Sequence, residues 1–329
     1  MSQLDNTDEI SKIAEQIHKS KLIAIAGHVS PDGDAVASCL SLAMGIKKLG
    51  KTPVVLLERY PARYNFIGMD EYIKFDSYEN IEPDLFICCD CGTKERMGQA
   101  EEVFDKCENT VVIDHHISNT GYGKINYIKA QASSTCELVF DIIMYMELMD
   151  KDIAAALYTG IIFDTGGLRF NSTSPETMRK IAALMEYGIP FTEIFTKTML
   201  IHSLEEVMIF SKIVSKMKFY DCLPIVYSTV TLSEMKEANA HKEDLEGIVE
   251  YMLNTKGAEV SVFIYETGEN EAKASFRSIE FDVNKIASNW GGGGHVNAAG
   301  AGVNLPVEKA AAEVMEYLAG RYREWKLTV

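Results

Sequence analysis

The first half of the chain alternates short apolar runs with stretches of helical periodicity, and this alternation restricts the fold more than any other feature. Residues Leu22–Ala26 form an apolar run of strand length that ends at Gly27, and residues 34–49 carry a helical pattern that ends at Gly50. Further strand-like runs occupy 54–57, 85–89 and 111–113, and further helical patterns occupy 8–20, about 134–149 and 152–165. Strands separated by helices are typical of βαβ units. We therefore expect an α/β fold with a mostly parallel sheet in this half.

The second half changes its pattern after a helical stretch. Ser174 and Pro175 start a helix with a capping side chain and a proline at its first position, and residues 192–218 predict a helical connector. Strand-like runs then occupy 225–230, 260–265 and 272–277, with helices near 244–254 and 307–323. We expect a first domain at 1–191 and a smaller α/β domain at 219–329, joined by this connector.

The charge balance excludes some classes of partner. The chain carries 48 acidic and 32 basic residues, a formal net charge of −16. A protein that coats duplex nucleic acid would need clustered lysine and arginine instead. A small phosphorylated substrate remains compatible, because bound metal ions can supply positive charge locally.

No apolar run reaches the roughly 18 residues of a membrane span, and residues 1–9 lack the features of a signal peptide. We expect a cytoplasmic protein with no membrane partner.

Cys88 and Cys91 form a C-x-x-C motif among seven cysteines that follow no disulfide framework. A zinc or redox pair needs this spacing on a turn or helix start, and structural zinc needs a second pair. Here the cysteines lie in and just after the apolar run Leu85–Cys89, and the sequence has no second pair. We expect buried thiols or thiols at a strand end, with a redox or zinc role as the alternative.

Histidine and aspartate residues gather directly after three of the predicted strands. Ligands of open α/β sheets bind outside the carboxyl ends of the strands, so these side chains are expected to converge. Crowded carboxylates repel one another unless cations neutralise them, and imidazole with carboxylate oxygens suits Mn²⁺, Zn²⁺ or Mg²⁺. For one motif alone, a polar loop that caps the next helix is the alternative. The residues concerned are His28, Asp32 and Asp34, then Asp90, then Asp114, His115 and His116.

Three further features lie outside these strand ends. Asp164 ends an apolar helical stretch before two glycines, where burial is costly unless the carboxylate binds something. Four glycines precede His295 and leave backbone N–H groups open to an anion, although a flexible turn with an incidental histidine is the alternative. Arg277 lies in a strand-like run, where its planar fork suits a phosphate or carboxylate, with a surface arginine as the alternative.

In this order, the motifs resemble those of the DHH phosphoesterase superfamily and its DHH-associated C-terminal domain. The length and motif set most resemble the nanoRNase and pAp phosphatase branch, and the resemblance extends from about Ala14 to Tyr322. Two departures are small: Ala37 stands where the family usually has glycine, and the glycine run has one extra member. The motifs that carry the resemblance are His28-x-x-Pro31-Asp32-x-Asp34, Asp90, Asp114-His115-His116, Asp164 and Gly292–His295 with Asn297-Ala298-Ala299-Gly300.

The resemblance implies a phosphoric ester hydrolase with two divalent ions, Mn²⁺ as the native metal. One ion would be held by His28, Asp32 and Asp90, and the other by Asp34, Asp90, His115 and Asp164. Asp90 would bridge the two ions. The resemblance implies that His116 contacts the scissile phosphate or helps the leaving oxygen. It implies that Asp114 supports the site without binding a metal itself.

The resemblance also implies an active site in the cleft between the two domains. Arg277 and His295 would hold a terminal phosphate there, with N–H donors from Gly292, Gly293 and Gly294. The expected substrates are short single-stranded RNA, dinucleotides or 3′-phosphoadenosine 5′-phosphate (pAp).

Three alternatives stay open. The cyclic-dinucleotide branch, acting on linear pApA or cyclic di-AMP, shares the metal ligands. A manganese-type pyrophosphatase is disfavoured, since its Arg- and Lys-rich C-terminal signature is replaced here by the glycine run and His295. A catalytically dead nucleotide-binding regulator is disfavoured because all six ligand positions are present. The oligomeric state is undecided, and a homodimer is one of the options.

Overall fold

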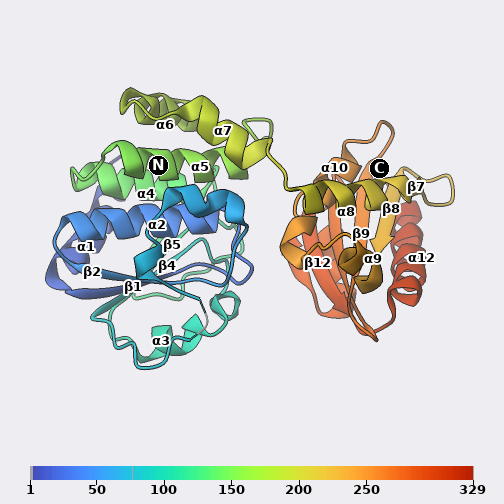
Figure 1. Cartoon of the computed structure of the whole chain (residues 1–329), viewed down its shortest axis with the longest axis horizontal. Coiled ribbons are helices and arrows are strands. Elements are labelled where there is room, and N and C mark those ends of the chain that lie inside the picture. The colour runs from blue at the N-terminus through green and yellow to red at the C-terminus, as the bar shows by residue number, and fades with distance from the viewer. Residues whose placement is uncertain (1–2, 76, 329) are drawn as a thin grey trace. The chain divides into compact units, whose positions relative to one another are not determined.

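The chain divides into two compact units, Met1–Ile201 and His202–Val329. The computed structural model describes residues 3–75 and 77–328 (Figure 1). The first unit contains a sheet of six strands, all parallel, in the order β3-β2-β1-β4-β5-β6. These strands are β1 (Leu22–Ala26), β2 (Thr52–Leu56), β3 (Ile73–Lys74), β4 (Leu85–Cys89), β5 (Thr110–Asp114) and β6 (Ile125–Ile128).

The predicted α/β fold with a parallel sheet is confirmed for this unit. The sequence missed β3 and β6, because these edge strands are short and only partly apolar. The central strands β4 and β5 are buried at every position, which explains why their near-continuous apolar runs were recognisable.

Helices cover both faces of this sheet (Figure 1). One face is covered by an inner layer of helices that forms the larger core. Helices α6 (Pro175–Glu186) and α7 (Phe191–Met199) pack outside this layer against α5 (Lys151–Asp164). The opposite face is covered by α3 (Ala100–Lys106) and the short 3-10 helix η3 (Lys94–Met97). The inner layer consists of α1 (Gln3–Lys19), α2 (Gly33–Lys48), α4 (Thr135–Tyr145) and α5 (Lys151–Asp164).

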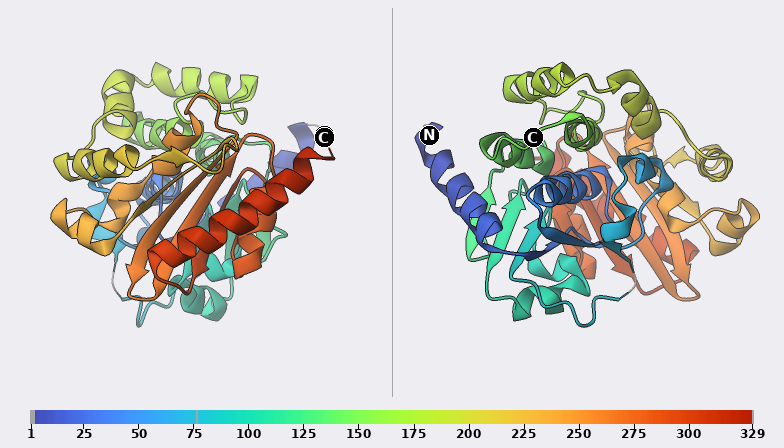
Figure 2. Two further views of the ribbon diagram at one scale, coloured as in Figure 1. Left: turned by 90° about the vertical axis from the view of Figure 1, so that its right-hand side faces the viewer. Right: turned by 60° about the vertical axis from the view of Figure 1, so that its left-hand side comes forward.

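The second unit has a six-stranded sheet in the order β11-β12-β10-β9-β8-β7, in which only β8 and β9 are parallel. Helix α12 (Val307–Lys326) packs on one face, as the left view of Figure 2 shows. Helices α8 (Leu204–Ser215), α9 (Leu232–Glu237) and α10 (Ile248–Leu253) cover part of the other face. The strands are β7 (Lys218–Phe219), β8 (Ile225–Val230), β9 (Val260–Gly268), β10 (Glu271–Ser278), β11 (Gly293–His295) and β12 (Ala298–Val303).

The glycine-rich segment, for which no strand was predicted, contains strand β11 in a hairpin with β12. A Cβ atom at Gly292 or Gly294 would collide with the backbone oxygen of Gly300 or Ala298, and Gly294 has a φ of 153°. Close approach of two backbones therefore requires glycine at these positions, independently of any ligand. Nothing in the sequence indicated this pairing, because the partner strand β12 consists mostly of alanine and glycine.

The predicted connector 192–218 is divided between the units, with α7 in the first and α8 in the second. Its limits, and those of the domains at 1–191 and 219–329, stay predictions. Cys88, Cys89 and Cys91 are free and buried, as expected. Among the described residues, none of the helices is long and apolar enough to span a membrane.

Candidate metal centre and substrate surface

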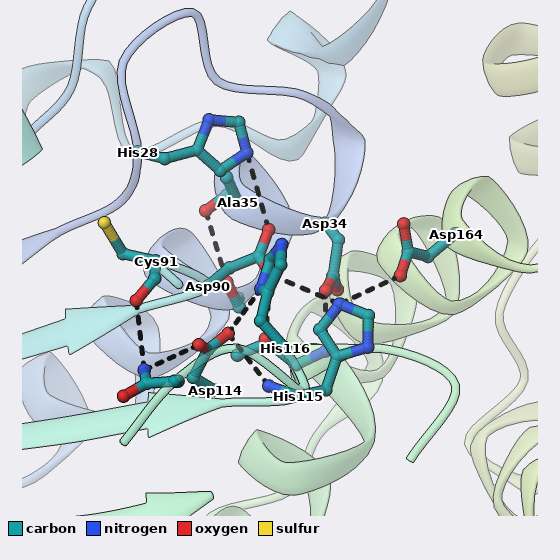
Figure 3. A network of polar contacts seen from close by, with 12 residues as sticks. His28, Asp34, Ala35, Asp90, Cys91, Asp114, His115, His116 and Asp164 are labelled. Atoms are coloured by element: carbon teal, nitrogen blue, oxygen red, sulfur yellow. Dashed lines mark hydrogen bonds and ion pairs between the residues drawn. The ribbon is translucent and has the colours of Figure 1, made fainter. Parts of the chain in front are cut away.

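The strand order brings two of the predicted motifs side by side. The sheet reverses its order between β1 and β4, and ligands of open α/β sheets bind at such a switch point. Strand β1 leads into His28, and strand β4 leads into Asp90, whose φ of 55° lies in the left-handed region. A non-glycine residue there is strained and persists only where its surroundings hold it. Figure 3 shows the side chains that gather at this edge.

His28, Asp32 and Asp90 form the first group of ligand atoms, all within 4.8 Å of one another. His28 Nε2 lies 3.6 Å from Asp32 Oδ2 and 3.6 Å from Asp90 Oδ2. Asp32 caps α2, and its Oδ1 accepts hydrogen bonds from the amides of Asp34 at 3.0 Å and Ala35 at 3.2 Å. The cap thus occupies one oxygen of Asp32 and leaves the other facing His28.

Asp34, His115 and Asp164 form the second group, also with ligand atoms within 4.8 Å. His115 Nε2 lies 3.2 Å from Asp164 Oδ2 and 3.5 Å from Asp90 Oδ1. Asp90 therefore presents one oxygen to a histidine of each group (Figure 3). The structure brings the six predicted ligands together in these two groups. The resemblance also implied Asp90 in the second group; Asp90 is not a member of that group, although its Oδ1 faces His115.

The N-terminus of α4 holds a carboxylate of each group in place. Asp34 accepts the amide of Thr135 at 2.6 Å and the amide of Cys136 at 3.0 Å. The hydroxyl of Thr135 donates to Asp90 Oδ1 at 3.0 Å. Free N–H groups at a helix start favour negative charge, so this helix end fixes Asp34 while the threonine orients Asp90.

His116 is held by a buried aspartate. His116 Nδ1 lies 2.7 Å from Asp114 Oδ1, and Asn119 Nδ2 donates to Asp114 Oδ2 at 2.7 Å. The amide of His115 donates to Asp114 Oδ1 at 2.9 Å. His116 Nδ1 is also 3.6 Å from Asp90 Oδ1, so a set of Asp90, His115 and His116 meets the same distance limit as the two groups above. Because Nδ1 is engaged with Asp114, Nε2 is the nitrogen through which His116 can act on a substrate.

The electrostatics of the cluster fit a cation. Burial, followed by the neighbouring Asp90 carboxylate, raises the pKa of Asp34 to about 7. Burial would lower the pKa of His28, but the carboxylates of Asp32 and Asp90 outweigh it and raise that pKa to about 9. Without a cation, the cluster therefore retains protons to reduce its own repulsion. Its carboxylate and imidazole donors are those that divalent metals take, so the residues present fit a metal centre.

Two of the substrate residues predicted in the second unit, Arg277 and His295, lie in one row of its sheet. Arg277 on β10 pairs in register with Ala298 on β12, and Ala298 pairs with His295 on β11. Residues paired in register point to the same face, so Arg277 and His295 share a face two strand spacings apart, about 10 Å. Arg277 Nη2 forms an ion pair of 2.5 Å with Glu250 Oε1, which the sequence did not indicate.

Sequence reasoning missed four residues that touch the predicted ones. Thr135 was recognisable only as part of a helix start, and Glu250 and Asn119 are unremarkable in the sequence. Arg96 lies on η3, with Nη2 3.3 Å from His28 Nδ1, and nothing in its local pattern marks it. The contacts of Thr135, Glu250 and Arg96 join segments far apart in the chain, which a local pattern cannot reveal. Asn119 is five positions from Asp114, in a loop whose conformation the sequence does not indicate.

The comparisons with known proteins agree with this geometry. Residues 22–161 match the DHH family, N-terminal domain, and residues 223–320 match the DHHA1 domain. The bifunctional oligoribonuclease and PAP phosphatase NrnA of Thermus thermophilus is 32% identical over 300 residues, which cover 89% of this chain and 88% of the relative. The protein of the same name from Bacillus subtilis is 26% identical over 307 residues, covering 85% and 89%. An exopolyphosphatase-related protein from Bacteroides fragilis superposes with a TM-score of 0.89 at 28% identity, with 97% of each chain covered.

The parallel sheet, the two ligand groups and these matches define a metal-dependent phosphoesterase of the DHH family with a DHHA1 domain, and the chain belongs to that family. Within it, the chain belongs to the branch of bifunctional oligoribonucleases and PAP phosphatases. It is a phosphoric ester hydrolase.

Proposed function

We propose that this protein hydrolyses short oligoribonucleotides, dinucleotides and pAp to mononucleotides, using two Mn²⁺ ions. The observation that carries the proposal is the position of Asp90, with one oxygen 3.6 Å from His28 and the other 3.5 Å from His115. A carboxylate that faces both ligand groups could be shared by the two ions of a two-metal phosphoesterase, which supports this proposal. The names of the relatives from Thermus thermophilus and Bacillus subtilis support the choice of substrates.

The six acidic and imidazole ligands divide between the two ions. His28 and Asp32 would hold one ion, Asp34, His115 and Asp164 the other, and Asp90 both. Mixed nitrogen and oxygen donors suit Mn²⁺ better than Mg²⁺, which prefers oxygen ligands and keeps more of its waters. Bound at this site, the ions would polarise the phosphoryl group and lower the pKa of an attacking water.

His116 supplies the proton for the leaving oxygen. Burial would lower the pKa of His116, but the hydrogen bond from Nδ1 to Asp114 raises it, which favours the imidazolium. An imidazolium whose Nδ1 proton is held by Asp114 donates from Nε2. Asp114 is fully buried and fixed by Asn119, so it orients the ring and does not itself touch the substrate.

The row on the second sheet recognises the rest of the nucleotide. Arg277 and His295 would bind a terminal phosphate, with the backbone N–H groups of Gly293 and Gly294 as further donors. Gly292, predicted as a third donor, instead donates its N–H to the carbonyl oxygen of Ala287 at 3.1 Å. The residue between Arg277 and His295 in this row is Ala298, whose small side chain leaves the space between them open. The acidic net charge of −16 favours a mono- or dinucleotide over a duplex, which would need clustered lysine and arginine.

A product assay tests the proposal. The Mn²⁺-loaded protein is incubated with pAp, linear pApA, cyclic di-AMP, pyrophosphate and 5′-labelled RNA of two to ten nucleotides. We expect AMP from pAp and pApA, and stepwise shortening of the oligomers. Turnover of pyrophosphate alone would contradict the proposal, and turnover of cyclic di-AMP and pApA without pAp would assign the cyclic-dinucleotide activity instead.

A further inference from the structure

A cation stands next to the first ligand group and takes no part in the function described above. Arg96 lies on η3, beyond the strand that ends at Asp90, and its Nη2 is 3.3 Å from His28 Nδ1. The side chain is exposed to solvent. A positive charge is thus available at the edge of a cluster that is otherwise strongly acidic.

The backbone holds Arg96 firmly in this position. Its carbonyl accepts the amide of Val29 at 2.7 Å, so η3 is tied to the loop that carries His28. Met97, the next residue, is buried in the core on that face of the sheet. Gly98 has a φ of 57°, and a Cβ there would lie 2.6 Å from Val29 Cγ1, so glycine permits the close approach of the two segments.

The guanidinium pairs with no carboxylate in the part of the chain that the structure describes. Among the residues that the structure describes, no carboxylate oxygen lies within ion-pair distance of Arg96, whereas Lys94 on the same turn pairs with Asp105 at 2.7 Å and Glu101 at 3.5 Å. The structure therefore gives Lys94 a local structural role and gives Arg96 none.

The contact with His28 does not satisfy Arg96 either. His28 Nε2 faces Asp32 and Asp90, and His28 Nδ1 lies 2.9 Å from the carbonyl oxygen of Val29. A histidine that binds a metal through one nitrogen typically donates its other N–H to such a carbonyl. A ring nitrogen that donates to Val29 cannot also accept from Arg96. With metal bound, the N–H groups of Arg96 are left for another acceptor.

We propose that Arg96 binds a phosphoryl oxygen of the substrate at the metal centre. The inference rests on the proposed function and extends it to a residue that the motifs do not contain. A guanidinium presents its donors in a planar fork that matches phosphate, and it stays charged at every working pH. Five carboxylates, of Asp32, Asp34, Asp90, Asp114 and Asp164, surround the site. An extra fixed cation would favour the approach of an anionic phosphodiester to such a cluster.

The test compares Arg96→Ala and Arg96→Lys with Lys94→Ala, a matched change of a cation on the same turn. Three quantities are measured for each variant: the affinity of the metal-free protein for Mn²⁺, the affinity of the Mn²⁺-loaded protein for AMP by calorimetry, and the kinetics on pApA. We expect Arg96→Ala to weaken AMP binding and to raise KM by about ten- to a hundred-fold, as for loss of a charge-assisted hydrogen bond. Mn²⁺ affinity should stay within about twofold of wild type, Arg96→Lys should recover part of the loss, and Lys94→Ala should behave as wild type.

Two results would overturn the inference. Unchanged AMP affinity and KM in Arg96→Ala would show that the guanidinium does not contact the phosphoryl group. A parallel loss of Mn²⁺ affinity would show that Arg96 positions His28 instead. Failure of the proposed function looks different, because the wild-type protein would then bind Mn²⁺ but cleave none of the nucleotide substrates.

Discussion

The backbone amide of Thr135 donates a hydrogen bond of 2.6 Å to Asp34 Oδ2, joining residues 101 positions apart in the sequence. The hydroxyl of the same threonine donates to Asp90 Oδ1 at 3.0 Å. Asp34 belongs to one ligand group, and Asp90 faces both. A single residue at the start of α4 therefore sets the spacing between the two groups.

Replacing Thr135 with valine should weaken metal binding without unfolding the protein. Valine keeps the amide bond to Asp34 and removes only the hydroxyl that orients Asp90. Loss of such an outer contact typically costs about 10- to 100-fold in metal affinity. Titration of the metal-free variant with Mn²⁺ measures the effect, and Thr135→Ser, which keeps the hydroxyl, is the matched control. Equal Mn²⁺ affinity in Thr135→Val and wild type would show that Asp90 needs no such support.

Metal removal should destabilise the protein more at high pH. In the metal-free protein the pKa of Asp34 is raised to about 7 and that of His28 to about 9. In the unfolded chain the pKa values of these groups are about 3.9 and about 6.5. Both groups bind protons more tightly in the folded state, so their contribution to stability is complete below the unfolded pKa. It is lost as pH rises, for Asp34 from about 4 to 7 and for His28 from about 6.5 to 9.

Thermal unfolding with and without Mn²⁺ at pH 6.0 and 8.5 measures this effect. We expect the chelator-treated protein to have a lower Tm at pH 8.5 than at pH 6.0. The rise in Tm on adding Mn²⁺ should be larger at pH 8.5, because the metal then competes with fewer protons. An equal rise at both pH values would mean that Mn²⁺ does not displace protons from these residues.

The sequence indicated the candidate ligands but not the arrangement that brings them together. His28, Asp90 and His115 were recognisable because each follows an apolar run of strand length, a local pattern. The strand order that places β1 beside β4 depends on pairing between distant segments, which no local pattern encodes. The left-handed backbone of Asp90 is equally invisible, since aspartate tolerates it without requiring it.

Polar support around the ligands was the hardest part to predict. Thr135 contacts Asp34 and Asp90, 101 and 45 positions away, and Arg96 contacts His28, 68 positions away. The glycines before His295 were interpreted as donors to an anion, whereas the structure also requires two of them for the close pairing of β11 with β12. A small residue in the sequence does not tell whether a ligand or a neighbouring strand needs the space.

His116→Ala should keep the metal ions and lose turnover. His116 Nδ1 is held by Asp114, so the ring is placed to transfer a proton from Nε2 rather than to complete a ligand group. Loss of such a group typically lowers kcat by about 10²- to 10⁴-fold. Metal analysis and kinetics on pApA measure both quantities in one preparation. Loss of one ion from His116→Ala would instead assign His116, with Asp90 and His115, to the metal.

Asp114→Asn gives an intermediate case. Asparagine keeps the shape of Asp114 but removes the charge that raises the pKa of His116. We expect kcat to fall less than in His116→Ala. Because a lower pKa lets His116 lose its proton at lower pH, the fall in rate on the alkaline side of the pH–rate profile should begin at a lower pH in the variant. An unchanged pH–rate profile would show that the Asp114 carboxylate does not tune the proton donor.

Substitutions of Arg277 and Glu250 should separate recognition from chemistry. Arg277 forms a 2.5 Å ion pair with Glu250 in the absence of substrate, so a bound phosphate must share or displace that carboxylate. Arg277→Ala removes a charge-assisted contact worth about 1.5–3 kcal/mol, and KM for pAp should rise by about ten- to a hundred-fold. Glu250→Gln removes the competing carboxylate, so KM for pAp should fall below that of wild type.

Bis-p-nitrophenyl phosphate has no terminal phosphate, and its hydrolysis should change little in either variant. An equal loss of activity on both substrates in Arg277→Ala would mean that the arginine supports the fold or the metal centre, because a contact to a terminal phosphate cannot affect a substrate that lacks one.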